Sequence, residues 1–161
     1  MPASKLHVGL ISDTHSLLRP EAIAALRGSD YIIHAGDICD LEILSALEEI
    51  APVTAVRGNN DRGAWTASIR ETEVLQLGET FLYVIHDLAE MEVDPRAAGF
   101  HVVISGHSHR PRSALRDGVL FVNPGSAGPR RFSLPVSVGR LVVSGAKVEA
   151  QLIELRLTEG R

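Results

Sequence analysis

Aspartate, asparagine and histidine residues follow five apolar segments of this chain, each at the point where the segment ends. The short sequences concerned are "SDTH" (12–15), "GD" (36–37), "GNND" (58–61), "HD" (86–87) and "GHSH" (106–109). Carboxylate and amide oxygens, together with imidazole nitrogens, are the ligands that hard to borderline divalent ions prefer. Taken singly, an Asp or Asn after a strand more commonly forms a turn or a helix cap. The ordered set indicates a site for two divalent metal ions.

The elements that must position these residues predict an α/β fold. In the first half of the chain, β-branched segments at 6–12, 31–35 and 53–57 alternate with helical patterns at 20–28 and 41–50. This βαβαβ order predicts parallel strands that are buried on both faces. Ligands of such sheets bind beyond the carboxyl ends of the strands, so we expect the polar residues to meet at one edge.

The remaining elements predict a second sheet. Helix 41–50 is expected to bury a stripe formed by Leu41, Leu44 and Leu47. The second half contains mostly β-strand patterns, at residues 73–77, 80–86, 101–106, 113–123, 135–145 and 147–157. Glycine-containing hairpin turns separate several of them, as in "LGET", "RDGV" and "SGAK". A mixed α/β fold with two sheets follows.

Composition and charge exclude several classes of function. The 161 residues fit a single domain covering 1–161, and a net charge of -4 argues against a nucleic-acid surface or an anionic-membrane surface. The single cysteine, Cys39, cannot form an internal disulfide, and the segment "MPASKLHVGLISD" lacks the features of a signal peptide. No apolar stretch reaches the roughly 18 residues of a membrane-spanning helix. We therefore expect a cytoplasmic protein.

The ordered motifs resemble those of the calcineurin-like metallophosphoesterases. "SDTH", "AGD", "RGNND", "IH" and "SGHSHRP" match the family pattern between residues 12 and 111. "NPGS" at 123–126 is similar to a segment of the small bacterial and archaeal phosphodiesterase branch, the YfcE-like proteins. The resemblance implies a four-layer αββα fold, in which a two-sheet β-sandwich is flanked by helices. It also implies a metal-dependent phosphoesterase that acts on a small phosphate ester, with phosphodiesters favoured over monoesters.

The resemblance also implies which residues hold the metal ions. One ion would be held by Asp13, His15 and His109. The other would be held by Asn59, His86 and His107. Asp37 would bridge the two ions, so that a shared hydroxide can attack phosphorus while the ions neutralise the phosphoryl oxygens. Manganese is the expected ion because all ligands are oxygen or nitrogen, with nickel, iron and zinc as alternatives.

Three polar residues lie next to the expected ligands without belonging to the ligand set. Asn60 stands where many family members have a histidine that contacts the phosphate and protonates the leaving oxygen, which an amide cannot do. Asp61 resembles a family carboxylate that orients a neighbouring residue, with a simple turn cap as the alternative. Asp87 replaces a common glycine, and it either reaches a metal ion or its water or, as we prefer, points to solvent.

Two alternative functions belong to other classes. The retromer scaffold subunit resembles this fold yet serves as an interaction platform, so a catalytically weak metal-binding scaffold is the main alternative. All seven ligand positions are filled by competent residues here, which favours an enzyme. A nuclease is disfavoured because the chain is small and has no basic groove.

Several other residues near the motifs have simple structural explanations. Cys39 is expected to be a small buried filler, since its sulfur is softer than the surrounding donors. Three arginines lie beside the motifs: Arg62, Arg110 and Arg130. Contact with a phosphate is one interpretation, but a lone surface arginine is the commoner case. The histidines within or at the start of strands are expected to be structural: His7, His34 and His101. Apolar residues on both alternating sets of "GRLVVSG" and "AQLIELRL" predict a homo-oligomer, either a dimer or a tetramer.

Overall fold

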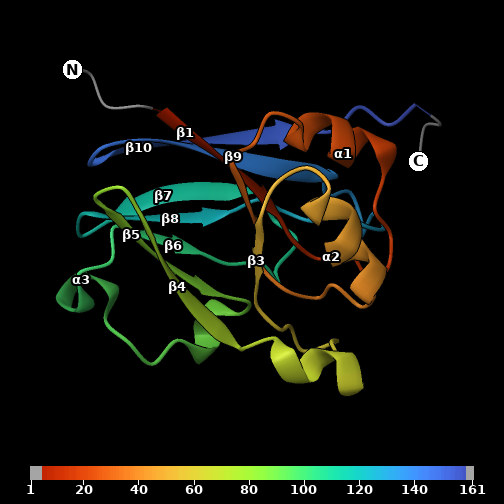
Figure 1. Ribbon diagram of the computed structural model, residues 1–161, viewed down its shortest axis with the longest axis horizontal. Helices are drawn as coiled ribbons and strands as arrows, with labels where there is room; N and C mark the ends of the chain where they lie inside the picture. The colour runs from red at the N-terminus through yellow and green to blue at the C-terminus, as the bar shows by residue number, and fades with distance from the viewer. Residues whose placement is uncertain (1–4, 159–161) are drawn as a thin grey trace.

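Two five-stranded sheets pack face to face in the computed structural model, which describes residues 5–158 (Figure 1). The predicted α/β class and the sandwich of two sheets are confirmed. The outer ends of the expected domain 1–161, and the first residues of the segment tested for a targeting signal, lie outside the described residues.

The first sheet has the strand order β10-β9-β1-β2-β3. Its strands are β1 (Lys5–Ile11), β2 (Tyr31–His34), β3 (Val53–Ala55), β9 (Ser137–Ser144) and β10 (Lys147–Glu154). Strands β1, β2 and β3 are parallel and are connected by helices α1 (Pro20–Leu26) and α2 (Leu41–Glu48), as the βαβαβ pattern predicts. Strand β9 pairs antiparallel with β1, and β10 pairs antiparallel with β9.

The second sheet has the strand order β4-β5-β6-β8-β7. Its strands are β4 (Thr72–Leu77), β5 (Thr80–Ile85), β6 (Val102–Ile104), β7 (Arg112–Arg116) and β8 (Val119–Asn123). The three central strands are parallel, and both edge strands pair antiparallel with their neighbours. The short helical elements η1 (Ala64–Ser68), η2 (Leu88–Glu90) and α3 (Pro95–Ala98) lie in the connections before β4 and between β5 and β6.

The main core lies between the two sheets. Val8 and Leu10 alternate along β1 toward the second sheet, where they join a cluster that includes Leu82 and Ile104. Ile11, on the opposite face of β1, belongs to a second cluster beneath α1 and α2. Because the first sheet is covered on both faces, its central strands are apolar on both alternating sets of residues.

Helix α2 buries a different stripe from the predicted one. Leu41 is 50% exposed, whereas Ile43, Leu44 and Leu47 are buried. The Asp40 side chain accepts a hydrogen bond from the N–H of Glu42 at 3.0 Å, and this cap starts the helix with Leu41 on its outer side. The predicted contribution of Leu41 to the core was therefore wrong, because the helix packs into the second cluster through Ile43, Leu44 and Leu47.

A short layer covers the outer face of the second sheet. Residues of β5, β6 and β8 form a small cluster there with Met91 and Phe100 from the segment that contains η2 and α3. Neither η2 nor α3 contributes a buried residue, so this layer is thin compared with α1 and α2 on the first sheet. In residues 5–158 no helix combines the length and the apolar character needed to cross a membrane.

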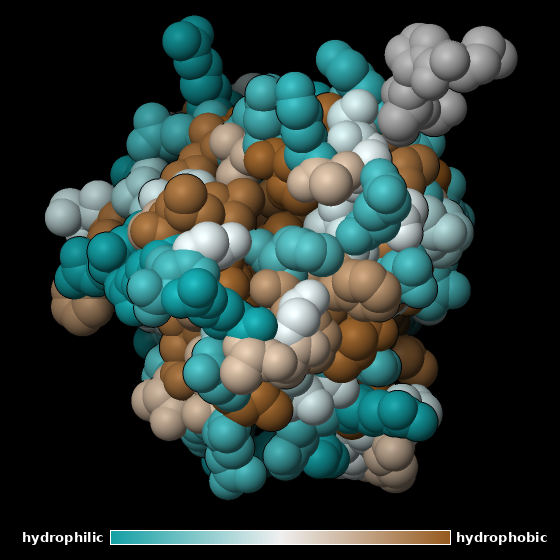
Figure 2. All heavy atoms as spheres, turned by 90° about the vertical axis from the view of Figure 1, so that its left-hand side faces the viewer, coloured by the Kyte–Doolittle hydropathy of each residue, from teal (hydrophilic) through white to brown (hydrophobic). Residues whose placement is uncertain are grey.

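The hairpin turns gather at one end of the molecule. The β4–β5 and β9–β10 turns and helix α3 lie at the left in Figure 1, where strand β1 begins. Figure 2 shows this end directly, with hydrophobic atoms in several separate groups between hydrophilic side chains. Strand β1 and its parallel neighbours end away from this side, and the candidate site is built on those ends.

Candidate metal centre

Five strand ends bring the expected donor residues to one edge of the molecule. In chain order they follow β1, β2, β3, β5 and β6: Asp13 and His15, Asp37, Asn59, His86, and His107 and His109. Backbone hydrogen bonds hold these strand exits together. The N–H of Asp13 donates to the carbonyl of Gly36 at 2.9 Å, and the N–H of Gly106 donates to that of His86 at 2.9 Å. Segments far apart in the sequence thus form one continuous rim.

Most of these donor residues adopt a left-handed backbone conformation. Positive φ angles occur at Asp13 (54°), His15 (44°), Asp37 (57°), His107 (70°) and His109 (62°). A left-handed non-glycine residue costs on the order of 1–3 kcal/mol, and such residues cluster at functional sites. The fold therefore maintains five residues in an unfavourable conformation at three strand exits, and each of them directs a potential ligand into the same space.

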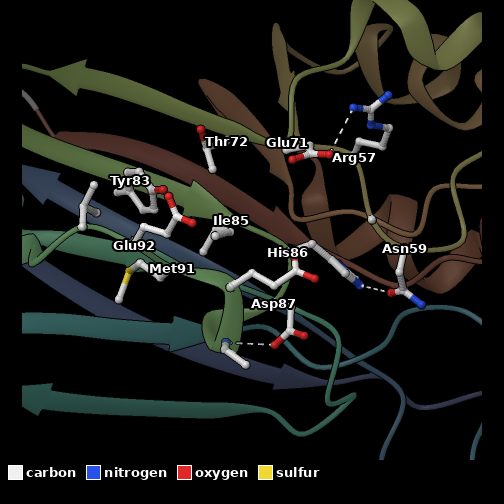
Figure 3. Close-up of a pocket in the computed structure, with 14 residues that line it drawn as sticks. Arg57, Asn59, Glu71, Thr72, Tyr83, Ile85, His86, Asp87, Met91 and Glu92 are labelled. Carbon is white, nitrogen blue, oxygen red and sulfur yellow. Dashed lines mark hydrogen bonds and ion pairs between the residues drawn. The ribbon is translucent and has the colours of Figure 1, made fainter.

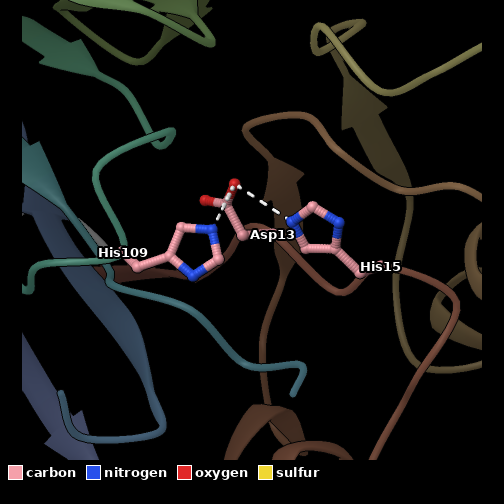
Figure 4. Close-up of side chains that lie close together, drawn as sticks. All are labelled: Asp13, His15 and His109. Atoms are coloured by element: carbon pink, nitrogen blue, oxygen red, sulfur yellow. Dashed lines mark ion pairs between the residues drawn. The ribbon is translucent and has the colours of Figure 1, made fainter. Parts of the chain in front are cut away.

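The first group of donors is Asp13, His15 and His109 (Figure 4). Oδ1 of Asp13 lies 3.8 Å from Nε2 of His15 and 3.4 Å from Nε2 of His109. Asp13 Oδ1 and His15 Nε2 are buried and have no hydrogen-bond partner within the described residues. An unpaired buried polar atom costs about 1–3 kcal/mol. A cation between these atoms would remove that cost, so the first group fits a metal ion.

The second group is Asn59, His86 and His107. Oδ1 of Asn59 lies 3.1 Å from Nε2 of His86, as Figure 3 shows, and 3.3 Å from Nδ1 of His107. Nδ1 of His86 lies 2.7 Å from the carbonyl oxygen of Ala35, which can only accept a hydrogen bond. Both ring nitrogens of His86 therefore face oxygen atoms. With the Asn59 oxygen in this position, a second proton on the imidazole or a cation beside Nε2 would be favourable, so the arrangement fits a metal ligand.

Asp37 lies between the two groups. Its Oδ2 atom is 3.5 Å from Nε2 of His15 in the first group and 3.4 Å from Nε2 of His86 in the second. The neighbouring strand exit leaves no room for a side chain at Gly58, because a β-carbon there would collide with the Asp37 carboxylate. One carboxylate oxygen is thus adjacent to donors of both groups, which is the arrangement that a bridging ligand requires.

The charged groups of the site shift one another's pKa values. Burial opposes ionisation of Asp37, but contacts with His86 and Asn60 hold the pKa of its carboxyl well below the usual range. Burial likewise opposes a charge on His86, yet Asp37 and Asp13 raise its pKa to about 9. Burial raises the pKa of Asp13. Burial and the charge of Arg131 lower the pKa of His109 to about 4. Without metal, Asp37 and Asp13 therefore favour the protonated imidazole of His86, and a cation beside Nε2 would compete with that proton.

Asp61 contacts backbone groups only. Its Oδ2 atom accepts hydrogen bonds from the N–H groups of Asp37 at 3.0 Å and Gly58 at 2.8 Å, and its Oδ1 atom accepts one from Cys39 at 2.7 Å. The side chain is buried. These hydrogen bonds fit the alternative of a turn cap, because the carboxylate holds the turn that carries Asp37. A role in orienting another side chain stays a prediction.

Asn60 lies at the open side of the site and binds the same carboxylate. Its backbone N–H donates to Asp37 Oδ1 at 2.9 Å, and its side-chain Nδ2 donates to Asp37 Oδ2 at 2.9 Å. Both oxygens of Asp37 therefore already accept hydrogen bonds from one residue. The amide is exposed, so it can also reach a group that enters from solvent.

Asp87 and Cys39 lie beside the expected ligands. Asp87 Oδ1 accepts a hydrogen bond from the N–H of Ala89 at 3.0 Å, while Oδ2 lies 3.7 Å from Nε2 of His107. This side chain caps η2 next to the second group and is still 28% exposed, so neither the contact with a metal ion nor the orientation toward solvent is decided. The Cys39 sulfur lies 3.9 Å from Nδ1 of His15, and burial with the charge of Asp61 raises the pKa of its thiol to about 11. The thiol is only half-buried, so the expected burial of Cys39 is met in part.

The sequence did not indicate two residues that support the site. His34 is fully buried; its Nδ1 accepts a hydrogen bond from the N–H of Gly36 at 3.1 Å, and its Nε2 lies 3.0 Å from Oγ1 of Thr14. Asn123 donates through Nδ2 to the carbonyl of Gly106 at 3.0 Å. The "NPGS" segment was a usable signal for Asn123. His34 was expected to be structural, but nothing in its own strand indicated that it joins two ligand-bearing turns.

Two cavities meet the site on either side of η2. The larger, of about 690 Å³, begins at Asn59 and His86 and continues along β4 and β5 (Figure 3). The smaller, of about 280 Å³, begins at His107 and extends over β7 and β8. Asp87 lines both cavities. Space for a ligand therefore exists in two directions from the donor residues.

The family model of the calcineurin-like phosphoesterase superfamily domain matches residues 6–146. The chain belongs to this superfamily. Its sequence is 37% identical over 157 residues to the probable metallophosphoesterase of Methanothermobacter thermautotrophicus, and the match covers 91% of each chain. The family expectation drawn from the motifs is therefore confirmed.

Solved structures with the calcineurin-like fold include two that match nearly the whole chain. Vacuolar protein sorting 29 from Cryptosporidium parvum has a TM-score of 0.83 at 23% identity, over 98% of this chain and 94% of that protein. An archaeal phosphodiesterase has a TM-score of 0.77 at 23% identity, over 92% of this chain and all of that protein (100%). At these identities the two structures support the shared fold only.

Proposed function

We propose that this calcineurin-like phosphoesterase is a phosphodiesterase that requires two divalent metal ions. The observation that carries the proposal is the position of Asp37 Oδ2, 3.5 Å from His15 Nε2 and 3.4 Å from His86 Nε2, between the two donor groups. When bound, two ions would neutralise the phosphoryl oxygens and activate a water molecule as the nucleophile. Manganese remains the expected ion because no sulfur ligand lies in either donor group.

The donor residues divide the work of holding the ions. The first group supplies the Asp13 carboxylate and two imidazoles, and the second group supplies two imidazoles and the neutral amide of Asn59. Since the amide oxygen brings no negative charge, the second position would stay more electropositive than the first. That asymmetry supports a site that attracts an anionic phosphate ester.

The cavities support a diester over a monoester. A phosphodiester carries two ester arms, whereas a monoester needs room for one. Cavities of about 690 Å³ and 280 Å³ meet the donor residues from opposite sides of η2. Asn60, on the open side, can donate a hydrogen bond to a phosphoryl oxygen but cannot protonate a departing alkoxide. The site thus suits small diesters with one good leaving group.

Metal content and hydrolysis together test the proposal. The purified chain should bind two manganese ions, measured by elemental analysis, and should hydrolyse bis-p-nitrophenyl phosphate. Asp37→Asn should lower the occupancy of both positions and abolish turnover. Asp87→Asn is the matched control, because Asp87 is a neighbouring carboxylate outside both donor groups, and it should keep at least one ion.

Two results would count against the proposal. Two bound ions and near-full activity in Asp37→Asn would remove the bridging assignment. A wild-type chain that holds no divalent ion and hydrolyses no activated diester would instead favour the alternative function, a metal-binding scaffold for protein–protein interaction. The complete donor set supports the enzyme.

A further inference from the structure

The smaller cavity is rich in arginine. Three arginines line this hollow of about 280 Å³: Arg110, Arg112 and Arg116. Arg112 and Arg116 lie on one face of β7, roughly 13 Å apart along the strand, with the small residue Ala114 between them. Phe121 pairs with Ala114 in the antiparallel ladder and forms part of the floor. The hollow thus lies over Ala114, between two long basic side chains.

None of the arginines of the hollow forms an ion pair with a carboxylate in the part of the chain that the structure describes. Within residues 5–158 the only ion pair between an arginine and a carboxylate joins Arg57 to Glu71, at 3.3 Å. The guanidinium carbon of Arg116 lies 5.5 Å from the centroid of the Phe121 ring, which restrains this side chain at the hollow. The chain as a whole has a net charge of -4. The three arginines around the hollow, which lack ion pairs within residues 5–158, therefore form a positive surface that contrasts with the rest of the protein.

The cavity on the other side of η2 has the opposite character. Glu71, Glu90 and Glu92 line it, and its arginine, Arg57, is already paired with Glu71. If an arm of the substrate extends from the metal centre and carries a negative charge, the glutamates on one side of η2 repel it. The arginines on the other side attract it. Asp87 is the one carboxylate that lines the hollow, and it lies beside His107, at 3.7 Å.

The hollow is connected to the donor residues. His107 lines it, so the hollow opens directly from the second donor group. Arg112 pairs across the ladder with Asn123, whose side chain donates to the carbonyl of Gly106 at 3.0 Å and to Oγ of Ser108 at 3.1 Å. The same residue therefore fixes both the strand that carries Arg112 and the turn that carries His107.

We propose that the hollow binds a phosphate group carried by one arm of the substrate, in addition to the phosphodiester at the metal centre. Guanidinium groups bind phosphate through paired, charge-assisted hydrogen bonds, and no carboxylate among residues 5–158 forms an ion pair with these arginines. The inference rests on the proposed phosphodiesterase function and names its substrate class, a diester whose arm bears a second phosphate.

A matched pair of esters tests this inference on the manganese-loaded chain. One is the p-nitrophenyl ester of thymidine 5′-phosphate, and the other is the same diester with a phosphate on its 3′ oxygen. Both release p-nitrophenol, so leaving-group chemistry is identical. We expect kcat/KM to be about tenfold higher for the 3′-phosphorylated ester, a modest value because exposed charges are screened. Arg112→Gln and Arg116→Gln should bring the ratio close to one, while Arg27→Gln, at the exposed end of α1, should keep it.

Equilibrium binding separates failure of the hollow from failure of the proposed function. Thymidine 3′,5′-bisphosphate should bind the metal-free chain, and Arg112→Gln should weaken its binding about tenfold in calorimetry. If neither ester is hydrolysed but this Arg-dependent binding occurs, the proposed function falls and the hollow stands. If both esters are hydrolysed with equal kcat/KM, in wild type and variants alike, the hollow is not a phosphate site and the proposed function stands.

Discussion

The carboxylate of Asp61 accepts a hydrogen bond from the backbone N–H of Asp37 at 3.0 Å, across the exits of two neighbouring strands. Asp37, the proposed bridging residue, is thus fixed through its backbone by the buried Asp61 side chain, which need not contact a metal ion itself. The same carboxylate also accepts hydrogen bonds from Gly58 and Cys39, so it joins both turns into one unit.

Asp61→Asn should lower both stability and metal binding. The amide replaces one acceptor oxygen with a donor that faces an N–H group, so the free energy of unfolding should fall by about 1–3 kcal/mol. Manganese content should also fall, because the Asp37 turn loses its anchor. Urea unfolding and elemental analysis measure the two effects.

Asp94→Asn is a suitable control for Asp61→Asn, because Asp94 also accepts two backbone N–H groups but lies at the start of α3. It should leave the manganese content unchanged. Wild-type manganese content in Asp61→Asn would contradict an anchoring role.

Asn60 should make turnover depend steeply on the leaving group. General-acid help is typically worth about 10²–10⁴-fold, and an amide cannot supply it. Aryl diesters should therefore react far faster than alkyl diesters, and Asn60→His should speed the alkyl esters selectively. The Asp61 carboxylate is poorly placed to orient the new imidazole, because its oxygens already accept three backbone hydrogen bonds. The gain in Asn60→His should consequently be at the lower end of this range.

The comparison for Asn60 uses one series of esters at matched manganese occupancy. A wild-type rate that hardly changes with leaving-group pKa would mean that another group delivers the proton, and the assignment of Asn60 would be wrong.

His34 should make the metal-free chain less stable as the pH falls below 6.5. Burial lowers its pKa from the ordinary 6.5 to about 3, so the unfolded chain takes up a proton that the folded chain refuses. The contribution of His34 to the free energy of unfolding is thus fully present above pH 6.5. It is lost progressively toward pH 3, at up to about 1.4 kcal/mol per pH unit. Urea unfolding with a chelator, between pH 7 and pH 5, measures the slope. His34→Gln should flatten it relative to wild type, and parallel profiles would refute the assignment.

The expected homo-oligomer stays a prediction. Apolar residues on both alternating sets of the last strands, on which it was based, now have another explanation. Strand β9 is apolar on both alternating sets because both faces of its sheet are covered within one chain. Leu115 and Leu152, however, are exposed on the edge strands β7 and β10. Light scattering should give a mass of two or four chains, and Leu115→Glu should reduce it. Leu41→Glu, at a similarly exposed leucine on α2, should not. A single-chain mass for wild type would contradict the prediction.

The strands and the donor residues were predictable from the sequence for the same reason. Apolar runs mark the strands, and a polar residue directly after such a run lies at the carboxyl end of its strand. The carboxyl ends of parallel strands lie side by side, so such residues come together. The contacts behind the donors were not predictable, because they depend on how separate strand exits meet. Asp61 could be recognised as a turn residue, but its three hydrogen-bond partners come from two different turns.

The arginine hollow illustrates a similar limit. The alternation of Arg112, Ala114 and Arg116 is visible in the sequence, whereas Phe121 joins them only through the register of β7 with β8. The stretch around η2 has no periodic pattern, so the thin outer layer was also beyond prediction. Helix α2 packs through Ile43, Leu44 and Leu47 and leaves Leu41 exposed, a choice of face that the leucine spacing did not reveal.

The wall between the two cavities is the short element η2, which contributes no buried residue to the protein. The ligand-bearing turns, in contrast, are locked to one another by buried hydrogen bonds. Insertions, deletions or charge changes in this wall would reshape both ester-arm compartments and leave the strand exits intact. Substrate choice and metal retention are therefore separable traits in this architecture, and selection can alter the first without rebuilding the second.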